Sequence, residues 1–252
     1  MPDSLDPLRS SIQRLRDLVE TLRPEQLIAK AYPTKWITAD VLSHLGSGAV
    51  IFERRLDDAL NGQPTPPEFA PSVWDEWNAK ATDAQAADAL AADRSALARL
   101  EAMTPDDQAR CSVDFGPFTL DYPAFFGLRL NEHVLHTWDI DVVTRPDVTL
   151  ASDAVAVMID NLELIARFSA KPTGTTHTLV IHTSEPARTF TITLTPETVT
   201  TSPGGDAQQA DVTLPAEAFV RLVYGRLDPG HTPPGITGAH HLDELRQVFP
   251  GP

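Results

Sequence analysis

The sequence has only one cysteine, Cys111, among its 252 residues, and it has no long apolar run. A single cysteine cannot form an internal disulfide, which is typical of proteins in a reducing compartment. No stretch approaches the roughly 20 apolar residues that a membrane-spanning helix needs. Residues 1–10 lack the basic start and the apolar run of a secretion signal. We therefore expect a cytoplasmic protein that does not enter a membrane.

Positive charge is also scarce, because 20 lysines and arginines face 35 aspartates and glutamates, a net charge of −15. No basic patch is visible in the sequence, so nucleic acids and anionic membrane surfaces are poor partners. Walker loops, dinucleotide-binding glycine patterns and the G-x-S-x-G elbow are absent as well. Cys111 lies near Asp106, Asp107 and Asp114, whose charges disfavour a thiolate, so we expect an inert thiol.

The first part of the chain has the apolar periodicity of helices. It predicts four of them, over residues 8–22, 38–60, 84–103 and from about 121 to 141. Four helices without a clear strand pattern favour a four-helix bundle. The proline-rich stretch 63–72 is predicted to be a loop. We expect the aromatic residues just after it to anchor that loop in the bundle, or else to line a pocket.

The pattern changes after Asp147. A helix is predicted over 152–168, and Phe190, Ile192 and Leu194 then alternate with threonines as in a strand with one buried face. The remaining segments are predicted as strands at 177–183, 198–202 and 210–214, and as helices at 215–227 and 241–249. The sequence therefore predicts an α+β protein with a helical domain over 1–147 and an α+β domain over 148–252.

The segment RLNEHVLHTWDID, residues 129–141, gathers polar side chains on one side of a predicted helix. Arg129, Glu132, His136 and Asp139 fall within about a quarter of a turn. Glu132 and His136 are at i and i+4, so their side chains converge. This stripe is either the solvated face of a surface helix or a metal site. The absence of lysine and the pairing of imidazole with carboxylate favour a divalent metal.

A metal site of this kind needs a third ligand, and His44 on the predicted helix 38–60 is the candidate. Taken alone, the position of His44 between two leucines favours a hydrogen-bonded core histidine. Two histidines and a glutamate with an open position are a catalytic zinc constellation. The H-E-x-x-H motif is absent, and Arg129 replaces the first histidine of H-x-x-E-H, which argues against the usual zinc proteases.

Three segments carry a resemblance to a known family: KWITADVLSHL at 35–45, R-x-x-E-x-x-x-H-x-x-D at 129–139 and ADVTLPAEAFVRLVYGRL at 210–227. In this order they resemble the mycothiol-dependent maleylpyruvate isomerase family of the DinB-like superfamily. The resemblance implies a DinB-like four-helix bundle followed by a sterol-carrier-like α/β sandwich domain. It also implies that His44, Glu132 and His136 bind a divalent metal, most often Zn²⁺.

The resemblance further implies a function and catalytic residues. The chain would use mycothiol for thiol transfer to a small electrophile, or for its cis–trans isomerisation, with a metal-activated thiolate as nucleophile. Asp139 would lie beside the metal and orient a ligand or the thiol. Arg226 matches the family's catalytic arginine, with Arg221 as the second choice, and Arg226 or Arg129 would hold a substrate carboxylate.

Two other functions remain open on the sequence alone. One is a metal-dependent hydrolase that uses metal-bound hydroxide, with Asp139 as the nearest base. The other is a non-catalytic protein that binds a small ligand. In each case the expected partners are small molecules, and we expect a monomer or a weak homo-oligomer.

Overall fold

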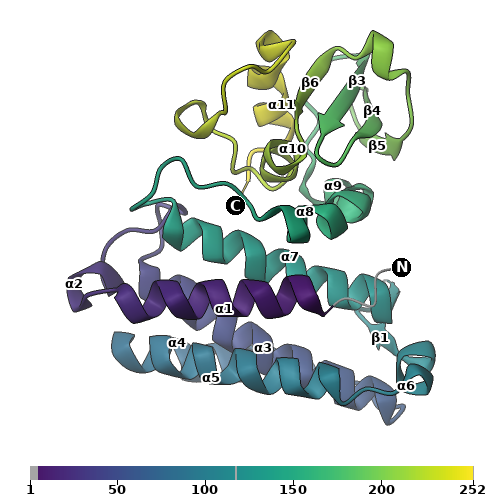
Figure 1. The fold of residues 1–252 in the computed structure, drawn as a ribbon. Helices are drawn as coiled ribbons and strands as arrows, with labels where there is room; N and C mark the ends of the chain where they lie inside the picture. The colour runs from purple at the N-terminus through teal and green to yellow at the C-terminus, as the bar shows by residue number, and fades with distance from the viewer. Residues whose placement is uncertain (1–4, 117, 252) are drawn as a thin grey trace. The chain divides into compact units, whose positions relative to one another are not determined.

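The computed structural model describes residues 5–116 and 118–251, and it confirms the α+β class (Figure 1). The chain forms two compact units, Met1–Val148 and Thr149–Pro252. The first unit is helical, and the second combines a four-stranded sheet with helices. In the part of the chain that the structure describes, no helix is long and apolar enough to cross a membrane.

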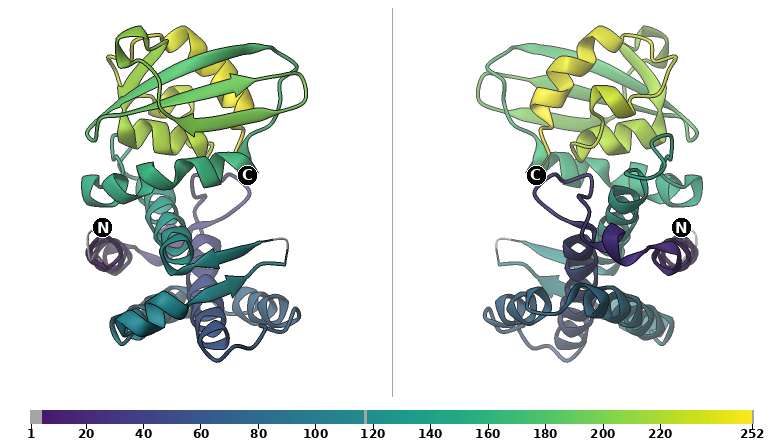
Figure 2. Two further views of the ribbon diagram at one scale, coloured as in Figure 1. Left: turned by 90° about the vertical axis from the view of Figure 1, so that its right-hand side faces the viewer. Right: turned by 90° about the vertical axis from the view of Figure 1, so that its left-hand side faces the viewer.

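Four long helices make up most of the first unit, at the positions that the periodicity predicted: α1 (Asp6–Thr21), α3 (Thr38–Leu60), α5 (Thr82–Glu101) and α7 (Tyr122–Asp141). Helices α1 and α3 each pack against both α5 and α7 (Figures 1 and 2). Small residues allow a close approach of α3 to α5. A Cβ on Gly46 would lie 2.9 Å from the Cα of Ala89 and 2.2 Å from the Trp77 ring, so only glycine fits there.

Short elements between these helices were not predicted. Helix α4 (Phe69–Asn78) overlaps the stretch expected to be a loop, so that prediction was wrong for residues 69–72. Pro71 lies in the first turn of α4, where the proline nitrogen needs no hydrogen bond. Val73 and Trp77 are buried, whereas Trp74 is exposed. The sequence also did not predict α2 (Pro24–Leu27), α6 (Pro105–Arg110), β1 (Ser112–Asp114) and β2 (Thr119–Asp121).

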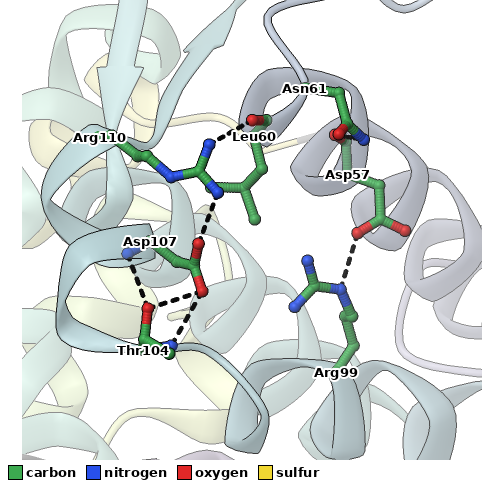
Figure 3. Close-up of polar contacts among 7 residues, drawn as sticks. All are labelled: Asp57, Leu60, Asn61, Arg99, Thr104, Asp107 and Arg110. Carbon is green, nitrogen blue, oxygen red and sulfur yellow. Dashed lines mark hydrogen bonds and ion pairs between the residues drawn. The ribbon is translucent and has the colours of Figure 1, made fainter.

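Polar contacts fix α6 to the end of α3 and join α3 to α5 (Figure 3). Thr104 caps α6 by accepting from the Asp107 amide at 3.1 Å, and the Asp107 carboxylate accepts from the Thr104 amide. Arg110 donates to Asp107 and to the Leu60 carbonyl at the end of α3. Arg99 of α5 donates to Asp57 of α3 at 2.7 Å.

These contacts predict an unusually acidic carboxyl group. Hydrogen bonds from Arg110, and then from Thr104, lower the pKa of Asp107 from 3.8 to about 2. Because the folded-state pKa is depressed, its stabilising contribution is present above the unfolded value and is lost as pH falls toward 2. An NMR titration is expected to give a pKa of about 2 for Asp107, and a higher value in Arg110→Gln. An unchanged pKa in that variant would contradict the assignment.

The second unit is built on a mixed sheet of order β5-β4-β3-β6. Strands β3 (His177–Ser184), β4 (Arg188–Leu194) and β5 (Val199–Pro203) are antiparallel neighbours, and β6 (Val212–Pro215) is parallel to β3. Ile181 pairs with Phe190, and both are buried on the same face. These strands match the four predicted ones closely.

Helices cover one face of this sheet (Figure 2). They are α8 (Ser152–Met158), α9 (Leu162–Ser169), α10 (Ala216–Val223) and α11 (Leu242–Val248). The predicted helix over 152–168 is interrupted by a 3₁₀ turn, η1 (Ile159–Asn161). Three more 3₁₀ turns lie in loops: η2 (Ala207–Gln209), η3 (Pro229–His231) and η4 (Ala239–His241).

Candidate metal site

The three residues predicted as metal ligands lie together in the first unit. His44 comes from the second turn of α3, and Glu132 and His136 are one turn apart on α7. One ligand atom from each lies within 4.8 Å of the other two, which makes the cluster a candidate metal site. The i,i+4 spacing on α7 and the packing of α3 against α7 produce this convergence.

Both histidines direct the same nitrogen toward the same carboxylate oxygen. The Nε2 atom of His44 lies 3.0 Å from Oε2 of Glu132, and the Nε2 atom of His136 lies 3.4 Å from it. The two imidazole rings meet edge to face, with centroids 4.6 Å apart. Ligands about 2.1 Å from a tetrahedral zinc lie about 3.4 Å from one another. The donor set and its spacing therefore fit a divalent cation.

Asp139 supports the site from behind His136. Its Oδ2 atom lies 2.8 Å from Nδ1 of His136, and the Asp139 side chain is fully buried. A proton held on Nδ1 by this carboxylate leaves Nε2 free to bind a cation. The backbone carbonyl of Asp139 accepts from the amide of Tyr32 at 3.0 Å, which ties α7 to the segment before α3.

The protonation equilibria of Glu132 and His136 favour a positive charge at the site. Burial raises the pKa of Glu132, but hydrogen bonds from His136 and His44 lower it more, so the pKa lies well below its ordinary value. Burial lowers the pKa of His136, whereas its hydrogen bonds to Asp139 and Glu132 raise it, with a net increase. In the absence of a metal, the Glu132 carboxylate therefore favours a proton on His136. A bound cation replaces that proton.

Trp36 forms an aromatic wall beside the two histidines. Its ring stacks on His136, with centroids 5.8 Å apart at 26°, and it is tilted against His44 at 5.2 Å. The sequence marked Trp36 only as part of the segment 35–45. Its packing on both imidazoles limits their rotation and shields one side of the cluster from water.

Arg129 does not join the cluster. It is buried, forms an ion pair with Asp93 of α5 and donates to the Leu45 carbonyl at 3.3 Å. His133 also contacts Asp93, at 3.1 Å, and its other nitrogen lies 2.8 Å from the Ser11 hydroxyl of α1. The solvated-face interpretation of the stripe was wrong, because Arg129, His136 and Asp139 are buried. A substrate-binding role for Arg129 stays a prediction, and its contacts are those of a structural residue.

The predicted catalytic arginines lie in the second unit, and both are buried. Arg226 donates to the Tyr224 carbonyl at 3.0 Å, and Arg221 pairs with Glu217 through two contacts of 2.7 and 2.8 Å. Arg221 also donates to the His231 carbonyl at 2.8 Å. The catalytic role of Arg226 stays a prediction. Cys111 is buried, and burial followed by the charge of Asp121 raises the pKa of its thiol, which keeps it protonated.

Replacing Asp139 with asparagine is expected to weaken metal binding about 10- to 100-fold while leaving the three ligands in place. The amide is uncharged and holds the Nδ1 proton of His136 less strongly, so Nε2 becomes a poorer ligand. Competition with a chromogenic zinc chelator measures the affinity. Asp141→Asn, two residues along α7, is the control and is expected to bind the metal as the parent chain does. Equal affinity of Asp139→Asn and the parent would refute this role.

Comparisons with known proteins identify the family of the chain and its fold. Residues 8–141, just over half of the chain, match the family described as the mycothiol maleylpyruvate isomerase N-terminal domain. Two solved structures share the fold: the mycothiol-dependent maleylpyruvate isomerase and a mutant of it in which a histidine is replaced by alanine. Each has a TM-score of 0.62 and 15% sequence identity, over 87% of both chains. No curated protein matches the sequence. The chain belongs to the mycothiol maleylpyruvate isomerase N-terminal domain family.

Proposed function

We propose that the chain is a metal-dependent enzyme that uses mycothiol as a thiol cosubstrate. Its reaction is transfer of the thiol to a small electrophile, or thiol-assisted cis–trans isomerisation of one. The observation that carries this proposal is the convergence of His44, Glu132 and His136 in a chain of this family. The similar solved structure is itself described as a mycothiol-dependent isomerase.

The donor set fits Zn²⁺, since two imidazole nitrogens and one carboxylate oxygen leave a position for an exogenous ligand. A cation held there would lower the pKa of a coordinated thiol, so that the sulfur is present as the more nucleophilic thiolate at neutral pH. An exchangeable position is what a thiol-dependent reaction requires and what a closed structural site lacks.

The residues of the chain have distinct roles in this proposal. His44, Glu132 and His136 bind the cation, and the negative charge of Glu132 offsets part of its positive charge. Asp139 keeps the proton of His136 on Nδ1. Trp36 fixes the planes of both imidazoles and excludes water from their side of the cluster.

The test combines metal analysis with a search for activity. Elemental analysis is expected to find about one metal ion per chain, mainly zinc. In cobalt-substituted protein, adding mycothiol is expected to change the visible spectrum by introducing a sulfur-to-cobalt charge-transfer band. Inorganic thiocyanate is the control for general anion binding to the metal. An alcohol analogue of mycothiol is the control for contacts made by the rest of the molecule without its sulfur.

Activity is then measured on a panel of small electrophiles, including cis-alkenes conjugated to a carbonyl, with and without mycothiol. Turnover that requires mycothiol supports the proposal. Turnover without a thiol would instead identify a metal-dependent hydrolase. Ligand binding without turnover of any electrophile would identify a non-catalytic binding protein.

A further inference from the structure

A concave site lies in the first unit, between α1 and α5, and it shares no residue with the metal cluster. It is a groove of about 480 Å³. Arg9, Ile12 and Arg16 line it from one face of α1, where their spacing of three and four residues aligns them. Arg94 and Leu97, one turn apart on α5, line the opposite side. The volume is in the range of small-molecule sites.

The groove concentrates positive charge in a strongly acidic protein. Three arginines line it and none of its described lining residues is acidic, although the whole chain has a net charge of −15. Arg9 is neutralised at one end of the groove, where it forms ion pairs with Asp6 and Glu101. In the described part of the chain, neither Arg16 nor Arg94 has an ion-pair partner. The groove therefore has two uncompensated guanidinium groups.

Arg16 also has an unfulfilled hydrogen-bond donor. Its Nε atom is buried and has no hydrogen-bond partner among the described residues. An unpaired buried donor on a charged group costs free energy unless a ligand satisfies it. An anion in the groove that pairs with the Arg16 guanidinium group would offset part of this cost.

We infer that this groove binds a small organic anion with a compact carboxylate or phosphate group and an apolar body. The guanidinium groups of Arg16 and Arg94 hold the anionic oxygens, since their fork of donors matches carboxylate and phosphate geometry. Ile12 and Leu97 contact the apolar body of the ligand. The site is separate from the proposed thiol chemistry and does not depend on it.

Isothermal titration calorimetry with phenyl phosphate and with benzoate tests the inference on the full chain. Saturable binding is expected for at least one of these anions. Its affinity is expected to fall as ionic strength rises. Phenol, which lacks the anionic group, and inorganic phosphate, which lacks the apolar body, are expected to bind more weakly. Equal affinities for phenyl phosphate and inorganic phosphate would overturn the apolar part of the inference.

A double variant, Arg16→Gln with Arg94→Gln, is expected to weaken binding of the anion at least about tenfold. The matched control is Arg23→Gln with Arg167→Gln, which removes the same total charge from exposed arginines outside the groove. It is expected to bind as the parent does. Equal loss in the two double variants, or no saturable binding to the parent, would overturn the inference.

A third variant tests whether the anion binds at the metal site and not in the groove. His44→Ala lacks a metal ligand and is expected to keep the affinity for phenyl phosphate. Loss of anion binding in His44→Ala would overturn the groove assignment. A failed search for thiol-dependent activity would leave these binding results unaffected, so the two proposals are tested separately.

Discussion

Replacing His44 with alanine is expected to reduce the metal content of the purified protein from about one ion per chain to nearly none. His44 supplies the only predicted ligand on α3, whereas the other two lie on α7. Without it, one imidazole and one carboxylate from a single helix remain, which is too few for a stable protein site. The loss of affinity is expected to exceed the roughly 10- to 100-fold effect of changing a supporting residue.

The measurement is elemental analysis after expression in zinc-supplemented medium, followed by a chelator competition assay. His240→Ala, which removes an exposed histidine of the second unit, is the matched control and is expected to retain full occupancy. Circular dichroism verifies the fold of each variant. The His44 side chain is 37% exposed, so its truncation opens no cavity in the core.

Glu132→Gln gives an independent check of the same site, because it keeps the shape of the side chain and removes its charge. The low pKa of Glu132 results from its hydrogen bonds with His136 and His44 despite the opposing effect of burial, so the parent carboxylate is ionised at neutral pH. The variant is expected to lose most of its bound metal. Full occupancy in both His44→Ala and Glu132→Gln would refute the site and with it the proposed chemistry.

The sequence predicted the long elements well because their signals are local. Residues such as Leu8, Ile12 and Leu15 recur with the helical period within one segment, and α1 lies where they placed it. The pair Glu132 and His136 was recognised for the same reason, since an i,i+4 spacing defines a common face without knowledge of the fold. His44 had no such local signal: it was a candidate because the site needed a third ligand from another helix, and the resemblance of its segment to a family supported that choice.

The missed features depend on contacts between distant segments. The three-residue strands β1 and β2 are too short to show alternation, and they exist because they pair with each other. Arg129 belongs to the same stripe as the metal ligands, yet it points to Asp93, which is 36 residues away in the sequence. Nothing in the alanine-rich segment around Asp93 marks that residue as buried, so the internal ion pair was invisible before the fold was known.

Replacing Asp93 with alanine is expected to lower the free energy of unfolding by about 3–5 kcal/mol. Its fully buried carboxylate holds both Arg129 and His133, and its removal leaves the guanidinium charge of Arg129 unpaired in the interior. Burial raises the pKa of Asp93, but the charges of His133 and Arg129 lower it more, so the net pKa lies below its ordinary value of 3.8. The contribution is thus present above pH 3.8 and is lost as pH falls below it.

Urea unfolding followed by circular dichroism measures this loss. Asp88→Ala is the control on the same helix, because Asp88 is half-exposed and pairs with Lys80 at 3.0 Å. It is expected to change stability by no more than about 1 kcal/mol. A double variant, Asp93→Leu with Arg129→Met, removes both charges and is expected to be more stable than Asp93→Ala. A change below about 1 kcal/mol in Asp93→Ala would show that the buried pair does not hold the bundle together.

Changing Asp93 is also expected to weaken metal binding, although Asp93 is not one of the three ligands. Arg129 and His133 flank Glu132 on α7, and Arg129 also donates to the carbonyl of Leu45, the residue after His44. Asp93 therefore fixes the rotation of α7 relative to α3, which determines whether the three ligands converge. Asp93→Asn, which preserves the side-chain volume, is expected to remain folded at low temperature and to bind metal more weakly than Asp88→Ala. If Asp93→Asn is destabilised but binds metal as tightly as the parent chain does, the buried ion pairs of Asp93 contribute to stability alone and not to the metal site.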